Sequence, residues 1–186
     1  MTPAASSLAR TKSERKALRR ARWRFSLDAP RRVGIETSLL WPAYPGLFFH
    51  LKSTVPIHQA RGEVLLGGQG RVPQLRAEEG TFSNLDAVLG WRQYAVHGIH
   101  FDVMLNLGWG RLRDSPLDGR DYDSFDIELM AVAGWRFGVG PLYFAIQPLG
   151  ISNVLNRTNP WPIEGRGTPR TEGPIYVGNV LFGVQF

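Results

Sequence analysis

Ser152 is the residue best suited to covalent chemistry, in the run Gly150-Ile151-Ser152-Asn153. A serine hydroxyl attacks an acyl carbonyl efficiently only when a neighbouring base, most often a histidine, takes its proton. Gly150 stands two residues before the serine, where a base would be well placed. The four histidines are elsewhere, at His50, His58, His97 and His100. The sequence therefore predicts no catalytic centre for acyl transfer.

Metal and phosphate chemistry would need other patterns, which the sequence does not supply. His50 and His100 have no accompanying cluster of closely spaced carboxylates, and the chain contains no cysteine. The glycine-rich run at 67–70 is not followed by the Gly-Lys-Ser/Thr of a phosphate-binding loop. A further group of acids lacks the glycine spacing of a calcium loop: Asp114, Asp118, Asp121 and Asp123. We therefore predict no metal, no cofactor and no enzymatic activity.

The charge of the chain is concentrated at one end. Residues 1–32 hold ten Arg and Lys residues against two acids, a balance of +8, whereas residues 33–186 hold twelve basic and fourteen acidic residues, a balance of −2. The formal net charge of +6 is thus a property of the first segment. We expect a basic, disordered tail at 1–32 and one folded domain at 33–186, with no nucleic-acid partner.

The folded domain is built from long stretches of period-two alternation. Between Gly98 and Arg111 six apolar side chains, from Ile99 to Trp109, alternate with polar or small ones. Such alternation is typical of a β-strand with one apolar and one polar face. At about 3.3 Å per residue the apolar face reaches ~30 Å, which at a tilt of roughly 40° covers the ~25 Å apolar band of a membrane barrel.

Eight segments carry this pattern: Val33 to Trp41, Leu47 to Ile57, Glu63 to Gly70, Ser83 to Tyr94, Gly98 to Arg111, Ser124 to Arg136, Leu142 to Ile151 and Ile175 to Phe186. Short links near Gln59, Val96 and Val139 alternate with two long links, Arg113 to Asp121 and Leu155 to Pro174. An even number of strands with alternating short and long links predicts an all-β fold, an eight-stranded antiparallel up-and-down transmembrane β-barrel. No apolar run is long enough for a transmembrane helix.

The polar faces of these segments would point into the barrel, where an unpaired charge is costly. We expect a charge-paired polar network there, in which Glu36 meets Lys52. Its members are Glu36, Lys52, Asp86, Arg92, His100, Asp102, Asn106, Asp126, Glu128 and Arg136, and the same faces carry His50, Glu63 and Asn179. A narrow gated pore is the functional alternative to such a structural filling.

Aromatic residues collect near the ends of the predicted strands. With the strands laid up and down, one rim carries Trp41, Phe49, Phe82, Trp109, Phe125 and Tyr176, and the other carries Trp91, Phe101, Trp135, Phe144 and Phe186. Amphipathic rings prefer the headgroup level of a membrane, so this sorting predicts two aromatic girdles.

The last segment carries a further motif, in which alternate positions are Tyr176, Gly178, Val180, Phe182, Val184 and Phe186. This pattern resembles the C-terminal strand of bacterial outer-membrane proteins, whose terminal aromatic residue is recognised by the barrel assembly machinery. Together with the strand count, it makes residues 33–186 similar to the small eight-stranded outer-membrane barrels of the OmpA and OmpX class. The resemblance implies a monomer in the Gram-negative outer membrane, in contact with lipid and lipopolysaccharide, with a structural, adhesive or limited-transport, porin-like role in the cell envelope.

An exported protein is expected to begin with a short basic region followed by an apolar run, and residues 1–32 contain no such signal peptide. Three interpretations stay open. The true signal lies upstream of this start, the segment is a basic arm that touches phosphate-rich lipid or nucleic acid, or it is a solvated segment without a partner.

Two other classes of function also stay open. A soluble lipocalin-like carrier of an apolar ligand would show the same alternation, with its apolar faces inward and its charged faces toward water. A lipid enzyme is suggested by Ser152-Asn153, which is similar to part of the His-x-Ser-Asn motif of outer-membrane lipid A deacylases, themselves small barrels. Gly150 replaces the histidine of that motif, so the resemblance lacks its activating base.

Overall fold

The computed structural model describes residues 32–40, 48–57, 59–71, 81–162 and 167–186. In these ranges the chain forms nine strands: β1 (Gly34–Ser38), β2 (Phe48–Ile57), β3 (Gly62–Arg71), β4 (Thr81–Tyr94), β5 (Ile99–Arg113), β6 (Tyr122–Val139), β7 (Leu142–Arg157), β8 (Glu172–Tyr176) and β9 (Asn179–Gln185). The same ranges contain no helix long and apolar enough to cross a membrane. The predicted tail lies almost wholly outside the described residues.

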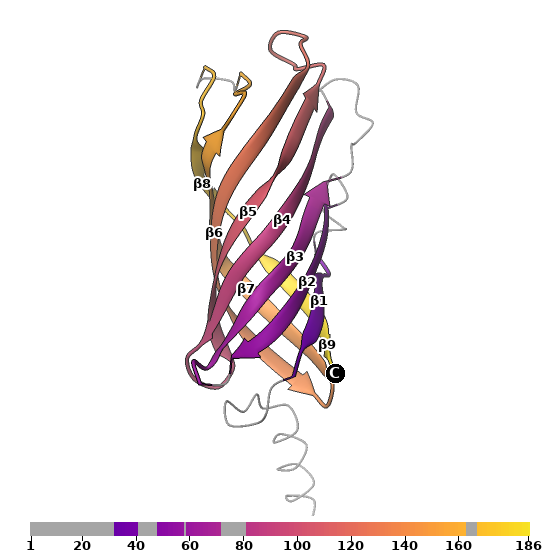
Figure 1. Ribbon diagram of the computed structural model, residues 1–186, viewed down its shortest axis with the longest axis vertical. Coiled ribbons are helices and arrows are strands. Elements are labelled where there is room, and N and C mark those ends of the chain that lie inside the picture. Colours follow the sequence, from indigo (N-terminus) through magenta and orange to yellow (C-terminus); the bar gives the residue numbers. More distant parts are fainter. Residues whose placement is uncertain (1–31, 41–47, 58, 72–80, 163–166) are drawn as a thin grey trace, which may run out of the picture.

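The strands close into an antiparallel barrel (Figure 1). Each strand from β1 to β7 pairs with the next, and β9 completes the circle by pairing with both β7 and β1. Among the described strands β8 pairs with β7 alone, and it continues the line of β9 along the same side of β7. We call each line of strand that runs once along the barrel wall a stave. β8 and β9 lie end to end and form one stave, so the barrel has eight. This confirms the predicted all-β, eight-stranded antiparallel barrel.

The eighth stave is divided because β7 is irregular opposite it. Residues 148–150 of β7 lie opposite only Val177 and Gly178, so β7 carries one extra residue there. Pro148 lies in this stretch and has no N–H to donate to a neighbouring strand. The prediction of a single strand over 175–186 is therefore corrected to two strands separated by Val177 and Gly178.

The links divide the barrel into two ends. Those after β2, β4 and β6 are at most four residues long and define the turn end, at the bottom of Figure 1. The turn between β4 and β5 closes on His97 and Gly98, both with positive φ, as a tight hairpin requires. The links at 114–121 and 158–171 define the opposite, loop end. The predicted alternation of short and long links is present at these positions.

Side chains alternate between the barrel interior and the outer surface with the period of two that a pleated strand imposes. On β5 every even-numbered residue from His100 to Leu112 is buried, and every odd-numbered one is exposed or half-buried. The apolar residues at odd-numbered positions from Ile99 to Trp109 face outward. The polar residues His100, Asp102 and Asn106 face inward, together with Met104 and Leu112.

Several strands differ in length from the sequence expectation. β6 extends three residues beyond Arg136, and β7 continues to Arg157 instead of ending at Ile151. Part of the predicted link from Leu155 to Pro174 is therefore strand, because β7 pairs with β8 toward the loop end (Figure 1).

Candidate functional site

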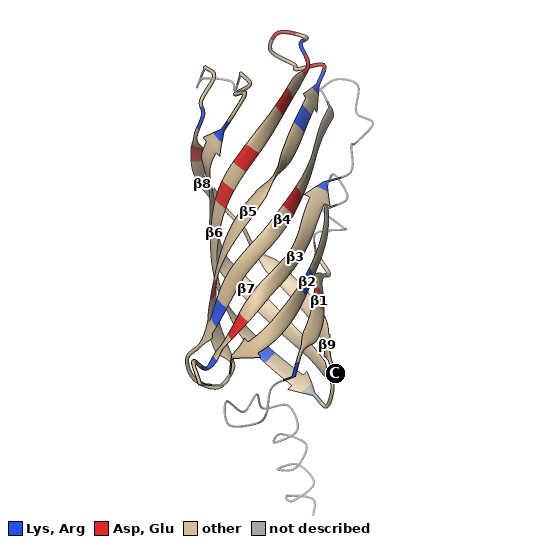
Figure 2. Cartoon of the chain, in the orientation of Figure 1, with Lys and Arg blue, Asp and Glu red and all other residues tan. Residues whose placement is uncertain are grey.

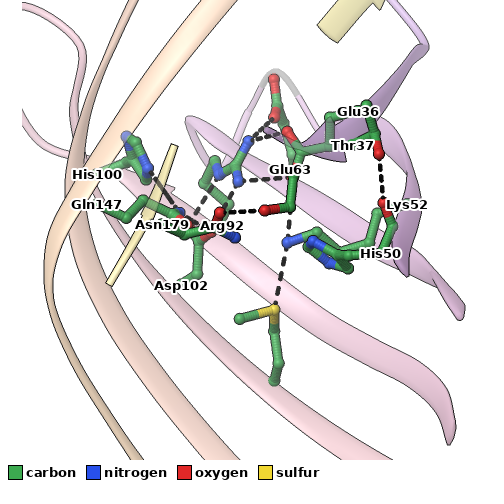
Figure 3. Close-up of polar contacts among 12 residues, drawn as sticks. Glu36, Thr37, His50, Lys52, Glu63, Arg92, His100, Asp102, Gln147 and Asn179 are labelled. Carbon is green, nitrogen blue, oxygen red and sulfur yellow. Dashed lines mark hydrogen bonds and ion pairs between the residues drawn. The ribbon is translucent and has the colours of Figure 1, made fainter. Parts of the chain in front are cut away.

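The turn half of the barrel interior is filled by ionised side chains gathered around Arg92 of β4 (Figure 3). Its guanidinium donates to both carboxylate oxygens of Glu36 on β1, at 2.8 and 3.0 Å. From its other side it donates to both oxygens of Asp102 on β5, at 2.8 and 2.7 Å. Two bidentate pairs on one guanidinium use its donors in the planar geometry that arginine favours.

A second arginine extends the network toward β3. Arg136 of β6 donates to both oxygens of Glu63, at 2.9 and 3.0 Å, and also bonds the hydroxyl of Tyr94. Its guanidinium lies 3.6 Å from the ring centre of Tyr143, a cation–π contact. The Tyr143 hydroxyl in turn donates to Glu36 at 3.0 Å, which links the two arginine groups.

The remaining charged member is Lys52 of β2, whose ammonium lies 3.1 Å from a carboxylate oxygen of Glu36. The pair expected from sequence is thus present. We call Glu36, Lys52, Glu63, Arg92, Asp102 and Arg136 the plug. It contains three acids and three bases, and every member is at most 1% exposed. Because charges buried at this depth are tolerable only when paired, the balance explains how the interior holds them.

Neutral groups complete the plug. Gln147 of β7 donates to Asp102 at 2.8 Å and contacts the imidazole of His100 at 3.2 Å. Asn179 of β9 accepts a hydrogen bond from Ser38 at 2.6 Å. His50 is also buried, and its carbonyl oxygen accepts a bond from Thr37. Tyr94, Tyr143 and Gln147 were not among the expected residues. Each lies two residues from another inward-facing residue of its strand, Tyr94 from Arg92 and the other two from Ala145.

The loop half of the interior holds a cavity of about 570 Å³. The cavity is bounded by β3 to β8 and by Trp161, which follows β7 and packs on Phe82 with ring centres 5.7 Å apart. Its polar lining includes the expected residues Asp86, Asn106, Asp126 and Glu128. Figure 2 shows acidic positions gathered along the upper part of β6, in contrast to mixed charges near the turn end. The polar network expected from sequence is therefore divided into the plug and the cavity.

The four carboxylates of the cavity are held in different ways. Asp126 and Glu172 share one cation, because Arg157 lies 3.1 Å from the former and 3.4 Å from the latter. Asp86 accepts from the amides of Gln69, at 3.2 Å, and Asn84, at 2.7 Å.

The fourth carboxylate, Glu128, accepts from the Asn106 amide at 2.8 Å and from the Ser152 hydroxyl. Asp86 and Glu128 therefore have only neutral donors among the described residues.

Ser152 faces this cavity and is 2% exposed. Inward residues of β7 are odd-numbered up to Gln147 and even-numbered at Ser152 and Val154. The extra residue at 148–150 causes the switch, since a bulge re-aims the side chains that follow it. No histidine of the described residues lines the cavity, and the serine hydroxyl donates to a carboxylate instead.

The acids of the loop at 114–121 and its flanks pair with protein groups. Asp123 meets Arg111 at 3.1 Å, and Asp121 meets Arg113 at 3.6 Å. The Tyr122 hydroxyl donates to Asp118, which lowers the pKa of the carboxyl and raises the pKa of the phenol. Within the described ranges no three His, Cys, Asp or Glu side chains are arranged to hold a metal ion.

The residues expected to form aromatic girdles lie at both ends of the outer surface. Trp109 packs edge-on against Phe125 toward the loop end, with ring centres 5.4 Å apart. The other described members are Phe49, Trp91, Phe101, Trp135, Phe144, Tyr176 and Phe186, and all are exposed or half-buried. Phe82 is a correction, because it faces the cavity and packs on Trp161. Trp41 lies outside the described residues.

The expected assembly motif spans the break in the eighth stave. Tyr176 and Gly178 lie before β9, and Val180, Phe182 and Val184 alternate along its outward face with Leu181 and Gly183 inside. Phe186 follows β9, and its amide donates to Val33 at 2.9 Å.

Comparisons with protein-family models, with curated proteins and with solved structures find no match to this chain.

Proposed function

We propose that this protein is an integral β-barrel of the bacterial outer membrane with a structural, non-enzymatic role, and that its barrel does not conduct solutes. The observation that carries the proposal is the inverted distribution of side chains. Large apolar residues follow one another along the outer surface, each between 48% and 69% exposed: Leu85, Leu89, Phe101, Val103, Trp109, Trp135, Leu149 and Ile151. The plug residues in the interior are charged and at most 1% exposed.

This distribution suits a lipid environment and is unfavourable in water. Exposing a Leu or Phe side chain costs about 1.5–3 kcal/mol relative to burying it, and soluble monomers rarely expose contiguous apolar patches of more than a few hundred Å². An apolar outer face with a polar interior is the arrangement of transmembrane barrels. The even stave number and the alternation of short turns and long loops support an outer-membrane location in particular.

The plug favours a structural role over transport. Eight strands enclose an interior just wide enough for side chains to fill. Here Arg92 and Arg136 connect carboxylates from β1, β3 and β5 across that interior. Ion flow through this level would require breaking buried, bidentate ion pairs.

The orientation of the faces argues against the soluble carrier. Such a carrier needs an apolar interior, whereas the side chains of Arg92, Asp102 and Glu36 are buried and Leu149 is exposed. The lipid enzyme likewise gains no support, since Ser152 is inside the barrel and its hydroxyl is bonded to Glu128.

Heat-modifiable mobility tests the membrane assignment. We expect the purified chain to acquire β-rich circular dichroism only with detergent or lipid, and to migrate differently on a gel with and without boiling. A chain that is folded and monomeric in plain buffer would contradict the proposal.

Planar-bilayer recording tests the second part of the proposal. We expect no discrete conductance steps from the folded protein, because the plug closes the turn half. Reproducible steps that disappear when the protein is omitted would show that the barrel is a pore.

A further inference from the structure

We propose that the cavity in the loop half binds an organic cation, a primary amine or guanidinium attached to an apolar body. This goes beyond the structural role proposed above and rests on a different region of the barrel. The first observation is the charge of the lining, which includes four carboxylates, Asp86, Asp126, Glu128 and Glu172, and two arginines, Arg71 and Arg157. The lining therefore carries two more acids than bases, whereas the plug is balanced.

Asp86 and Glu128 are the two acids of the lining that have no ion pair within the described residues. Arg157 is occupied by Asp126 and Glu172 and by the face of Trp161, 3.6 Å away. No lysine or arginine of the described residues lies within ion-pair distance of Asp86 or Glu128, whose contacts are amides and a hydroxyl. Asp86 is buried, at 7% exposed, and Glu128 is half-buried. Because a carboxylate with little access to water is stabilised most by a cation, the two groups favour one between them.

Asn106 supplies an independent observation that points to a donor. Its side chain is 2% exposed, and its amide nitrogen donates to Glu128 at 2.8 Å. That bond fixes the orientation of the amide, because only the nitrogen can donate. The remaining oxygen, Oδ1, is buried, has no hydrogen-bond partner and belongs to a residue that lines the cavity. Asn84 repeats the arrangement, with its nitrogen on Asp86 and its Oδ1 unpartnered.

A glycine makes room for one of these acids, Asp86. Gly108 of β5 pairs with Asp86 on one side and Asp126 on the other, and a Cβ there would come within 2.2 Å of an Asp86 oxygen. Glycine at this position therefore leaves room for the Asp86 carboxylate, which lines the cavity. A ligand group that reaches Asp86, Glu128 and the Asn106 Oδ1 would meet three acceptors, so a hydrogen-bond donor suits this part of the lining.

The rest of the lining suits an apolar body. Phe82, Met130, Val154 and Trp161 surround the same space. Its volume of about 570 Å³ is within the range of small-molecule sites, which is roughly 300–1,000 Å³, and is far larger than a bare ion requires. Since the described residues offer no metal-binding group of three ligands, the chemistry favours an amphipathic amine over a metal ion.

Fluorescence titration with dansylcadaverine, a primary amine joined to an aromatic ring by a five-carbon chain, tests the proposal. The full chain folded in detergent micelles is compared with empty micelles, and N-pentyl dansylamide serves as a neutral probe with the same ring and chain. We expect saturable binding of the amine and much weaker binding of the neutral probe. Asp86→Asn with Glu128→Gln should weaken amine binding roughly tenfold or more, and leave the neutral probe unaffected.

Asp121→Asn is the matched control, because it neutralises an exposed acid in the loop at 114–121 and should leave binding unchanged. Equal binding of both probes by the unaltered protein would overturn the proposal, as would unaltered amine binding in the double variant. If the double variant lost the binding of both probes, the carboxylates would have a role in shaping the cavity, and the proposal would also be contradicted. Displacement of the amine by micromolar Ca²⁺ would overturn the proposal and identify the ligand of the cavity as a metal ion.

Discussion

Arg92 shows how strongly burial in the barrel interior changes the contribution of an ion pair to stability. It is bonded to carboxylates from β1 and β5, and all three side chains are fully buried. Arg111 on β5 also pairs with an acid, Asp123, but these side chains are 65% and 50% exposed. Water solvates the exposed pair with or without its partner, whereas the buried carboxylates depend on Arg92 for their counter-charge.

Arg92→Met should therefore destabilise the fold by about 3–5 kcal/mol, because it leaves Glu36 and Asp102 buried without their main partner. Arg111→Met, the matched control on the adjacent strand, should cost less than about 1 kcal/mol. Urea unfolding of both variants in lipid vesicles, followed by tryptophan fluorescence, gives the comparison. Equal midpoints for the two variants would mean that the plug contributes nothing specific to stability.

Replacing Ser152 is expected to change no enzymatic activity. Its hydroxyl is inside the barrel and is bonded to Glu128, and no described histidine lines the same cavity. We expect the folded protein to release no acyl chain from lipopolysaccharide, with or without Ser152→Ala. Mass spectrometry of lipid A after incubation measures this. Acyl release that the substitution abolishes would restore the lipid-enzyme hypothesis.

At the scale of the elements, β7 is the strand that organises the loop half. The extra residue at 148–150 turns Ser152 inward, and a second register shift opposite Ile127 and Glu128 turns Arg157 inward. Without the first bulge Ser152 would be on the outer face, and without the second Arg157 would not bridge Asp126 and Glu172. Two irregularities of one strand thus supply part of the lining of the cavity.

The pairing of β2 with β3 depends on Gly67. A Cβ at this position would lie 2.1 Å from the backbone oxygen of Leu51, which cannot move without disturbing the ladder, so Gly67→Ala should cost roughly 1–3 kcal/mol. Gly68→Ala is the control on the opposite face, where the nearest atom is at an ordinary 3.4 Å. Urea unfolding in vesicles measures both, and equal stability of the two variants would disprove the role of Gly67.

At the scale of the whole molecule, the barrel has a closed half and an accessible half within one apolar outer surface. The plug closes the turn half with balanced charge, and the cavity leaves the loop half with an excess of acid. The two halves differ because three bases, Lys52, Arg92 and Arg136, match the three acids near the turns, whereas two arginines face four acids near the loops.

Leu89 tests the environment of the outer surface. It is 53% exposed near the middle of the apolar face, opposite Leu66 and Leu105. In a bilayer Leu89→Arg should cost about 2–4 kcal/mol, because the charge would lie in hydrocarbon. Leu117→Arg, in the loop at 114–121 and 47% exposed, should be nearly neutral. Unfolding from lipid vesicles measures the difference, and a neutral Leu89→Arg would argue against a membrane-embedded barrel.

The sequence by itself determined the barrel and the faces of its regular strands. In β5 the alternation from Ile99 to Trp109 was sufficient, because the period of two is a local property of any extended strand. The approach of Glu36 to Lys52 was also predictable, since these residues are on neighbouring strands. The sequence thus predicted which charged residues face the interior.

Only the tertiary structure decided which of those charges meet. Arg92 reaches Glu36 from a strand that is not its neighbour, and such contacts depend on the stagger with which a closed barrel brings its staves together. The two bulges of β7 reverse the side-chain parity without any local signal beyond Pro148. Trp161, which lines the cavity, follows β7 at a position with no periodic pattern. Alternation is a local property, whereas stagger, bulges and the contact between Trp161 and Phe82 depend on the closed barrel.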